Sequence, residues 1–178
     1  MNDIAPARPS ATVVVARAAT AEPEVFMVRR HPESSFGAAY AFPGGVVDDD
    51  DAVVHEHCTG LSEEQANSRL GVKANGLDFY SAAIRELFEE SGLLLASSKD
   101  LDEDLNVVRD GLNEGSESWS AFVKRDRLRL HCDKLHYISH WLTPAMLPKR
   151  YSTRFFLARL PEGQSARHCG GELTDSRW

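Results

Sequence analysis

Residues 83–92 read AIRELFEESG, and this stretch decides the fold. Its apolar residues recur with the period of a helix, which predicts a helix over residues 78–91 that ends at the capping Gly92. A helix advances by about 100° per residue, so its side chains sort into two faces. Three apolar side chains share the face that suits a core: Ile84, Leu87 and Phe88. Three acids share the other side: Glu86, Glu89 and Glu90.

Three neighbouring acids on one face repel each other unless something compensates their charge. Arg85 stands four residues before Glu89, within reach of its carboxylate. Hard cations such as Mg²⁺ and Mn²⁺ prefer oxygen ligands and leave coordination sites for water and phosphate. A Glu-rich helix face is nevertheless most often solvated surface. The residues on either side of the helix therefore have to decide between the two interpretations.

Strands are expected on both sides of this helix. Before it, we expect a buried strand over 10–16 and a second over 24–30, paired with the first as a hairpin. A short helix over 62–70 has Ser62 as its cap and ends at Gly71. Weaker helical patterns follow near 102–113 and 117–125, and strand patterns over 137–142 and 154–160. This order of elements predicts an α/β or α+β domain.

Residues 85–93, RELFEESGL, match every fixed position in the second half of the Nudix box, and the chain thereby resembles the Nudix family. The segment FPGG at 42–45 is similar to the entry of that box, and six residues after Gly45 stands Asp51, where the family usually has Glu. Gly45 and Arg85 are 40 positions apart, about 26 more than in the usual box. One branch of the family, which includes a peroxisomal coenzyme A diphosphatase, is similar in this insertion. Its downstream motif is matched by RYSTRFF at 150–156.

The resemblance implies a site for Mg²⁺ or Mn²⁺ on the predicted helix. Glu86 and Glu90 would be metal ligands, and Glu89 a third ligand or a water-positioning acid. A backbone carbonyl at Gly44 or Gly45 would complete the site, since glycine lets the backbone approach an ion closely. Arg85 would orient Glu89 through an ion pair.

Other residues have weaker claims to this site. The general base would come from the helix or from a later loop, where Glu172 is the candidate. Asp51 would touch the metal site or only mark the start of the insertion. Arg29 and Arg30 are candidates for gripping substrate phosphates; together with Gly37 they resemble the coenzyme A signature of related hydrolases. Trp141, Phe155 and Phe156 are interpreted as core residues rather than as a base-stacking platform.

The implied fold is a single Nudix domain over residues 11–178, after a disordered N-terminus at 1–10. This fold is an α/β/α sandwich with a mixed sheet, here with an insertion at about 52–77 and a helical segment at about 98–130. The resemblance also implies a last helix beyond Trp178, so that either the chain is truncated or a partner completes the fold. Apolar surface exposed there would favour association, so a homodimer is expected.

Composition excludes several function classes. The net charge of −7 argues against electrostatic binding of nucleic acid. No apolar run is long enough for a membrane span. Three scattered cysteines predict no disulfide framework, and a cytoplasmic location is the default. The cluster of His55, His57 and Cys58 lacks a fourth ligand at zinc spacing.

The leading function is hydrolysis of a diphosphate linkage in a small nucleotide derivative, with coenzyme A or an acyl-coenzyme A as the best substrate guess. A dinucleotide or nucleotide-sugar diphosphatase is the rival among enzymes. A non-catalytic domain that binds a nucleotide and regulates a partner is the rival from another class, although such regulators tend to lose the glutamates that this chain keeps. A plain interaction domain with an acidic helix is a third interpretation.

Overall fold

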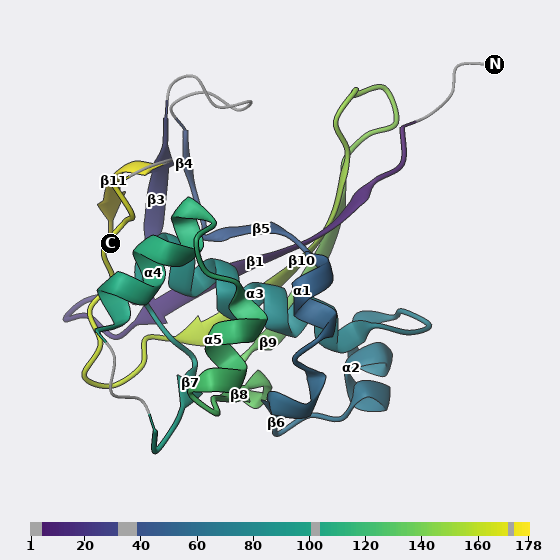
Figure 1. Ribbon diagram of the computed structural model, residues 1–178. Coiled ribbons are helices and arrows are strands. Elements are labelled where there is room, and N and C mark those ends of the chain that lie inside the picture. Colours follow the sequence, from purple (N-terminus) through teal and green to yellow (C-terminus); the bar gives the residue numbers. More distant parts are fainter. Residues whose placement is uncertain (1–4, 32–38, 101–103, 171–172) are drawn as a thin grey trace.

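The computed structural model describes residues 5–31, 39–100, 104–170 and 173–178 (Figure 1). The strands are β1 (Arg8–Arg17), β2 (Glu24–Val25), β3 (Met27–Arg30), β4 (Tyr40–Ala41), β5 (Gly44–Val46), β6 (Cys58–Thr59), β7 (Ala96–Ser97), β8 (Arg129–His131), β9 (His136–Leu142), β10 (Tyr151–Arg159) and β11 (Leu173–Arg177). The helices are α1 (Asp49–Ala52), α2 (Glu63–Leu70), α3 (Gly76–Ser91), α4 (Leu105–Glu114) and α5 (Trp119–Arg125), with short 3₁₀ turns η1 (His55–His57) and η2 (Cys132–Lys134).

The main sheet is mixed, as predicted. Its strand order is β2-β1-β10-β9, and β5 also pairs with β1. β1 and β10 run parallel, from Arg8 opposite Tyr151 to Ala16 opposite Arg159, whereas β9 is antiparallel to β10. Two smaller sheets, β11-β3-β4 and β6-β8-β7, flank it.

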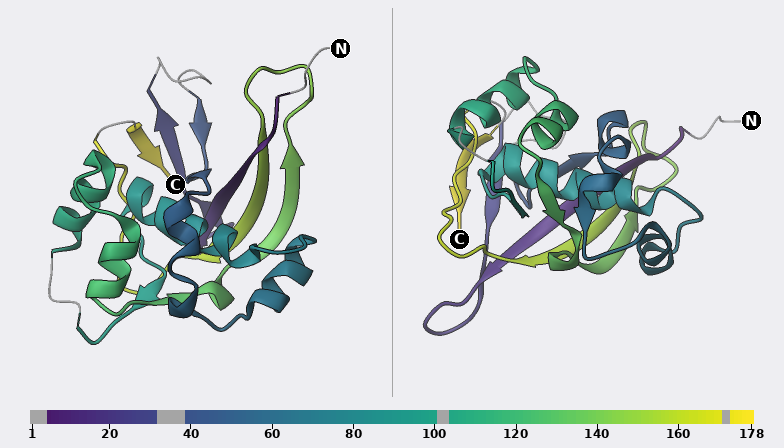
Figure 2. Two further views of the ribbon diagram at one scale, coloured as in Figure 1. Left: turned by 45° about the vertical axis from the view of Figure 1, so that its right-hand side comes forward. Right: turned by 60° about the horizontal axis from the view of Figure 1, so that its bottom comes forward.

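Helix α3 covers one face of the main sheet. Alternate residues of β1 are fully buried, namely Ala11, Val13 and Val15, while Thr12, Val14 and Ala16 between and after them are only partly buried. Helices α4 and α5 lie on the side of α3 that faces away from the main sheet (Figures 1 and 2). The mixed α/β fold that the sequence predicts is thus confirmed.

Two expectations about the N-terminal part need correction. Residues 8–10 are not disordered, because β1 starts at Arg8 and pairs there with residues 151–153 of β10. The predicted strand over 24–30 is split at Phe26, which turns into the core and is 1% exposed. Only β2 forms the expected hairpin with β1, and β3 pairs instead with β11 and β4.

The insertion contains the predicted short helix α2. Ser62 caps α2 in a capping box with Gln65, and Gly71 ends it in the left-handed conformation. The insertion returns to α3, which begins at Gly76 and ends, as predicted, at the left-handed Gly92. Within the described residues, no helix is long and apolar enough to cross a membrane.

Candidate functional site

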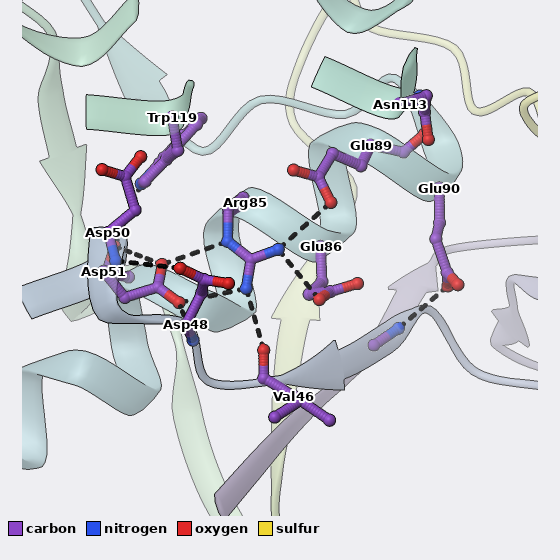
Figure 3. A network of polar contacts seen from close by, with 12 residues as sticks. Val46, Asp48, Asp50, Asp51, Arg85, Glu86, Glu89, Glu90, Asn113 and Trp119 are labelled. Atoms are coloured by element: carbon purple, nitrogen blue, oxygen red, sulfur yellow. Dashed lines mark hydrogen bonds and ion pairs between the residues drawn. The ribbon is translucent and has the colours of Figure 1, made fainter. Parts of the chain in front are cut away.

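Arg85 of α3 is the centre of a polar network that links the helix to the start of the insertion (Figure 3). One guanidinium nitrogen, Nη1, donates to Glu86 at 2.9 Å and to Glu89 at 3.1 Å. The other, Nη2, donates to the backbone oxygen of Val46 at 2.9 Å and to Asp51 at 3.0 Å. Arg85 is itself only 8% exposed, so these partners hold a buried charge in place.

Asp51 is completely buried and belongs to this network. Its carboxylate accepts from Arg85 Nε at 3.2 Å as well as from Nη2, from the Ser81 hydroxyl at 2.9 Å, and from the backbone N–H of Asp48 at 2.9 Å. Its hydrogen bonds thus go to Arg85, Ser81 and Asp48. Of the two interpretations, a structural anchor at the start of the insertion fits these contacts better than a metal ligand.

The two glycines of β5 bring backbone against the glutamates of α3. The Gly44 N–H donates to Glu90 at 2.9 Å, and the Gly44 carbonyl accepts from Arg30 at 3.4 Å. A Cβ atom at Gly45 would collide with the Glu86 carboxylate, and one at Gly44 would collide with the β1 backbone. Only glycine fits this strand without displacing its neighbours, which explains the pair of glycines at the box entry.

Burial changes the protonation of these acids. Burial raises the pKa of Glu89 to about 7, against the opposing effect of Arg85, and burial likewise raises the pKa of Glu86. Burial alone would lower the pKa of Arg85, but Asp51 and Glu86 outweigh it and raise that pKa. The site therefore combines a permanently charged arginine with acids that resist ionisation, an arrangement that a bound cation would relieve.

A cavity of about 550 Å³ opens beside these residues. Glu86, Glu90, Gly44, Gly45 and Arg30 all line it. It lies over β1, β5 and β10 and continues to the loop after β9. The structure thus brings five of the predicted site residues to one cavity of a size that suits a small ligand.

Other predicted residues lie elsewhere. Glu89 lines a separate polar hollow with Asp48, Asp49 and Asp50, although it shares Arg85 with Glu86. Arg29 lies over the Tyr40 ring, 6.0 Å from its centre, and does not line the cavity. The candidates Glu172 and Gly37 lie outside the described residues.

No group of three or more acidic, histidine or cysteine side chains converges on a metal position in the described part of the chain. Glu86 and Glu89 are turned toward Arg85, and Glu90 toward Gly44. The insertion's His55 and His57 are engaged in structural contacts: His55 bonds Asp78 at 2.6 Å, and His57 bonds the Leu128 carbonyl at 2.9 Å.

The interpretation of Trp141 as a core residue is wrong. Its side chain is 68% exposed and lines the cavity together with Phe155, whereas Phe156 is indeed buried. Alternation along β10 places Phe155 and Phe156 on opposite faces, a signal already present in the sequence. The exposure of Trp141 could not be read in the same way, because it depends on which elements cover β9.

The fold and the site together define the class: this is a Nudix domain. A family model described as "NUDT19 Nudix domain" matches residues 64–178, more than half of the chain, and the chain belongs to this Nudix family. Nudix hydrolase 7 of Caenorhabditis elegans is 28% identical over 96% of the chain. The chain spans 50% of that relative's length.

Solved structures agree with this assignment. A NUDIX hydrolase from Alicyclobacillus acidocaldarius is 28% identical and superposes with a TM-score of 0.78, over 97% of this chain and 78% of the other. A MutT/nudix family protein from Enterococcus faecalis, 13% identical, superposes with a TM-score of 0.54 over 100% of this chain and 45% of the other. The second likeness supports the fold alone.

Proposed function

We propose that the protein hydrolyses a diphosphate linkage in a nucleotide derivative with the help of Mg²⁺ or Mn²⁺. One observation carries the proposal: Glu86 and Glu90 reach the same cavity as Arg30, against a strand whose glycines leave room only for backbone. Carboxylates that can bind a metal ion and an arginine that can bind a phosphate lie in one cavity. This arrangement suits a diphosphate held between the metal ion and Arg30. Membership of a family of hydrolases supports the same reaction.

The donor set fits a hard divalent cation. Glu86 and Glu90 offer carboxylate oxygens in the cavity, and the Gly44 carbonyl adds a backbone oxygen. Glu89, which lines the separate hollow and shares Arg85 with Glu86, is the proposed third ligand or water-positioning acid. The bound ions would neutralise the diphosphate oxygens and lower the pKa of a bound water.

The chain's own residues would orient the substrate and the ligands. Arg30, whose guanidinium already reaches the Gly44 carbonyl, would hold a phosphate oxygen of the substrate. Arg85 would hold Glu86 and Glu89 in position through the hydrogen bonds that it donates to both carboxylates. Glu172 remains the proposed general base.

Coenzyme A or an acyl-coenzyme A is the proposed substrate. The sequence motifs at 42–45 and 150–156 and the NUDT19 domain match support this choice over a dinucleotide or a nucleotide sugar. Cleavage would then yield a 4′-phosphopantetheine and adenosine 3′,5′-bisphosphate.

Product analysis tests the proposal. The protein would be incubated with Mg²⁺ or Mn²⁺ and coenzyme A, acetyl-coenzyme A, NADH, ADP-ribose or a dinucleoside polyphosphate. We expect cleavage of coenzyme A, with Glu90→Gln reducing the rate by more than the ~10–100-fold that loss of an outer partner costs. Glu114→Gln, exposed at the end of α4, is the matched control and should keep the full rate.

The other outcomes are equally informative. Cleavage of another panel member in place of coenzyme A would retain the reaction and reject the substrate. Retention of full activity by Glu90→Gln would contradict the assigned site. Absence of any cleavage would overturn the proposed hydrolysis and favour the non-catalytic interpretation of the domain.

A further inference from the structure

An exposed aromatic residue, Trp141, lines the same cavity as the glutamates. Trp141 is 68% exposed near the end of β9, and Leu142, Pro144 and Tyr151 line the cavity as well. A large aromatic side chain left this open beside a candidate site is more informative than a scattered exposed residue, since such groups often contact ligands.

Phe155 supports the indole from the neighbouring strand. The two ring centres are 5.9 Å apart, and the planes are inclined by 54°, a tilted pair of the kind that aromatic rings favour. Phe155 is partly buried and therefore steadies the exposed ring. The pair thus presents an aromatic surface toward the cavity that a planar ligand could stack on.

Two hydroxyls lie in one row with the indole. Across the sheet, Ser10 of β1 is opposite Thr153 of β10, and Thr153 is opposite Trp141 of β9, so their side chains share one face. Ser10 is only 5% exposed and lines the cavity, yet its hydroxyl has no hydrogen-bond partner among the described residues. A buried hydroxyl without a partner is costly unless a ligand supplies one.

Two groups of residues that line the cavity call for different chemistry. Arg30, Glu86 and Glu90 suit an anionic diphosphate with its cations, whereas the row from Ser10 to Trp141 suits a flat ring with polar atoms. An aliphatic tail would cover the indole but give Ser10 no partner. Resting on the proposed function, we infer that the base of the nucleotide substrate stacks on Trp141 and that Ser10 and Thr153 bind polar atoms of its nucleoside.

Ligand binding by the intact chain tests this inference apart from hydrolysis. AMP and ribose 5-phosphate would be titrated in Mg²⁺ buffer, with tryptophan fluorescence and calorimetry as readouts; AMP has no diphosphate to cleave. We expect AMP to quench fluorescence and to bind more tightly than ribose 5-phosphate. Trp141→Ala should weaken AMP binding about tenfold or more, as expected for one lost base stack, and leave ribose 5-phosphate unchanged.

Three further variants make the test specific. Trp141→Phe should restore most of the affinity for AMP, because phenylalanine keeps a stacking face. Ile138→Ala, a 51% exposed apolar residue of β9 outside the cavity, is the matched control and should bind AMP normally. Ser10→Ala should weaken AMP binding without lowering the melting temperature, since its hydroxyl has no partner within the described residues to lose.

The results separate this inference from the proposed reaction. Equal affinity for AMP in Trp141→Ala and wild type would overturn the stacking, even if coenzyme A is cleaved. Binding of AMP that depends on Trp141, without hydrolysis of any diphosphate, would overturn the reaction and leave the base site standing.

Discussion

Arg85 shows how one side chain can connect segments far apart in the sequence. Asp51, 34 residues earlier, takes two of its hydrogen bonds, while Glu86 and Glu89 share a third nitrogen. A buried guanidinium surrounded by acids is stable only while each partner remains, because the loss of one leaves charge without compensation. The orientation of Glu86 and Glu89 thus depends on Asp51, which holds Arg85 from outside their helix.

At this scale we predict that Asp51→Asn destabilises the protein by about 3 kcal/mol, as expected when a buried ion pair loses one partner. The new amide nitrogen would also face the donors of Arg85 or Asp48. Urea denaturation would measure the change in free energy of unfolding. Asp49→Asn, exposed on the same short helix, should stay within about 0.5 kcal/mol of wild type. Equal stability of the two variants would contradict the anchoring role.

The packing of β5 against α3 depends on the absence of a side chain. Helix α3 could be predicted from the sequence because its apolar period, its acids and Gly92 all agree. Strand β5 could not, since its three residues show no alternation and it pairs with β1 more than 30 residues away. The contact of Gly45 with Glu86 therefore emerges only from the fold.

For this pair of elements we predict that Gly45→Ala abolishes the metal-dependent rise in melting temperature. The added methyl would overlap the Glu86 carboxylate and displace it from the cavity. Differential scanning fluorimetry with and without Mn²⁺ would show the loss. Gly170→Ala, where an added Cβ meets nothing within 4 Å, should respond to Mn²⁺ as wild type does. A wild-type response of Gly45→Ala would mean that Glu86 does not bind the ion.

For the whole molecule, local features of the sequence were a better guide than long-range ones. The helices α2, α4 and α5 could be predicted from periodicity and caps, and the box could be recognised from adjacent residues. The parallel pairing of β1 with β10 joins segments some 140 residues apart, which no local pattern encodes. The cavity, which residues of both β1 and β10 line, depends on that pairing. The exposure of Trp141 depends on which elements cover β9, and no local pattern encodes that either.

The free energy of unfolding should depend on whether Glu89 is ionised. The pKa of Glu89 is about 7 in the folded protein, above its ordinary value of 4.5, so the folded state binds protons more tightly than the unfolded one. Without metal, stability should therefore fall as the pH rises from about 5 to 7. Metal ions bind the ionised form, so the gain from Mg²⁺ should be larger at pH 8 than at pH 6.

Melting temperatures in EDTA and in Mg²⁺ at these pH values would check both signs. In Glu89→Gln, the contribution of this group to the metal-free decline should disappear, and the gain from Mg²⁺ should shrink. A metal-free stability that rises over the same pH interval in wild type, but not in the variant, would contradict the raised pKa of Glu89.

The insertion is tied to α3 at several points. Asp51 bonds Arg85, His55 bonds Asp78, and Glu63 and Asn67 of α2 accept from the backbone N–H of Gly76. Side chains, rather than a short connection, therefore keep the two halves of the box in register. The exposed residues 73–75 between α2 and α3 take part in none of these contacts, so a change of length there would leave the glycines in place relative to the glutamates. Evolution can use such a segment as a place for new sequence, and a protein engineer can graft a reporter or a recognition peptide there.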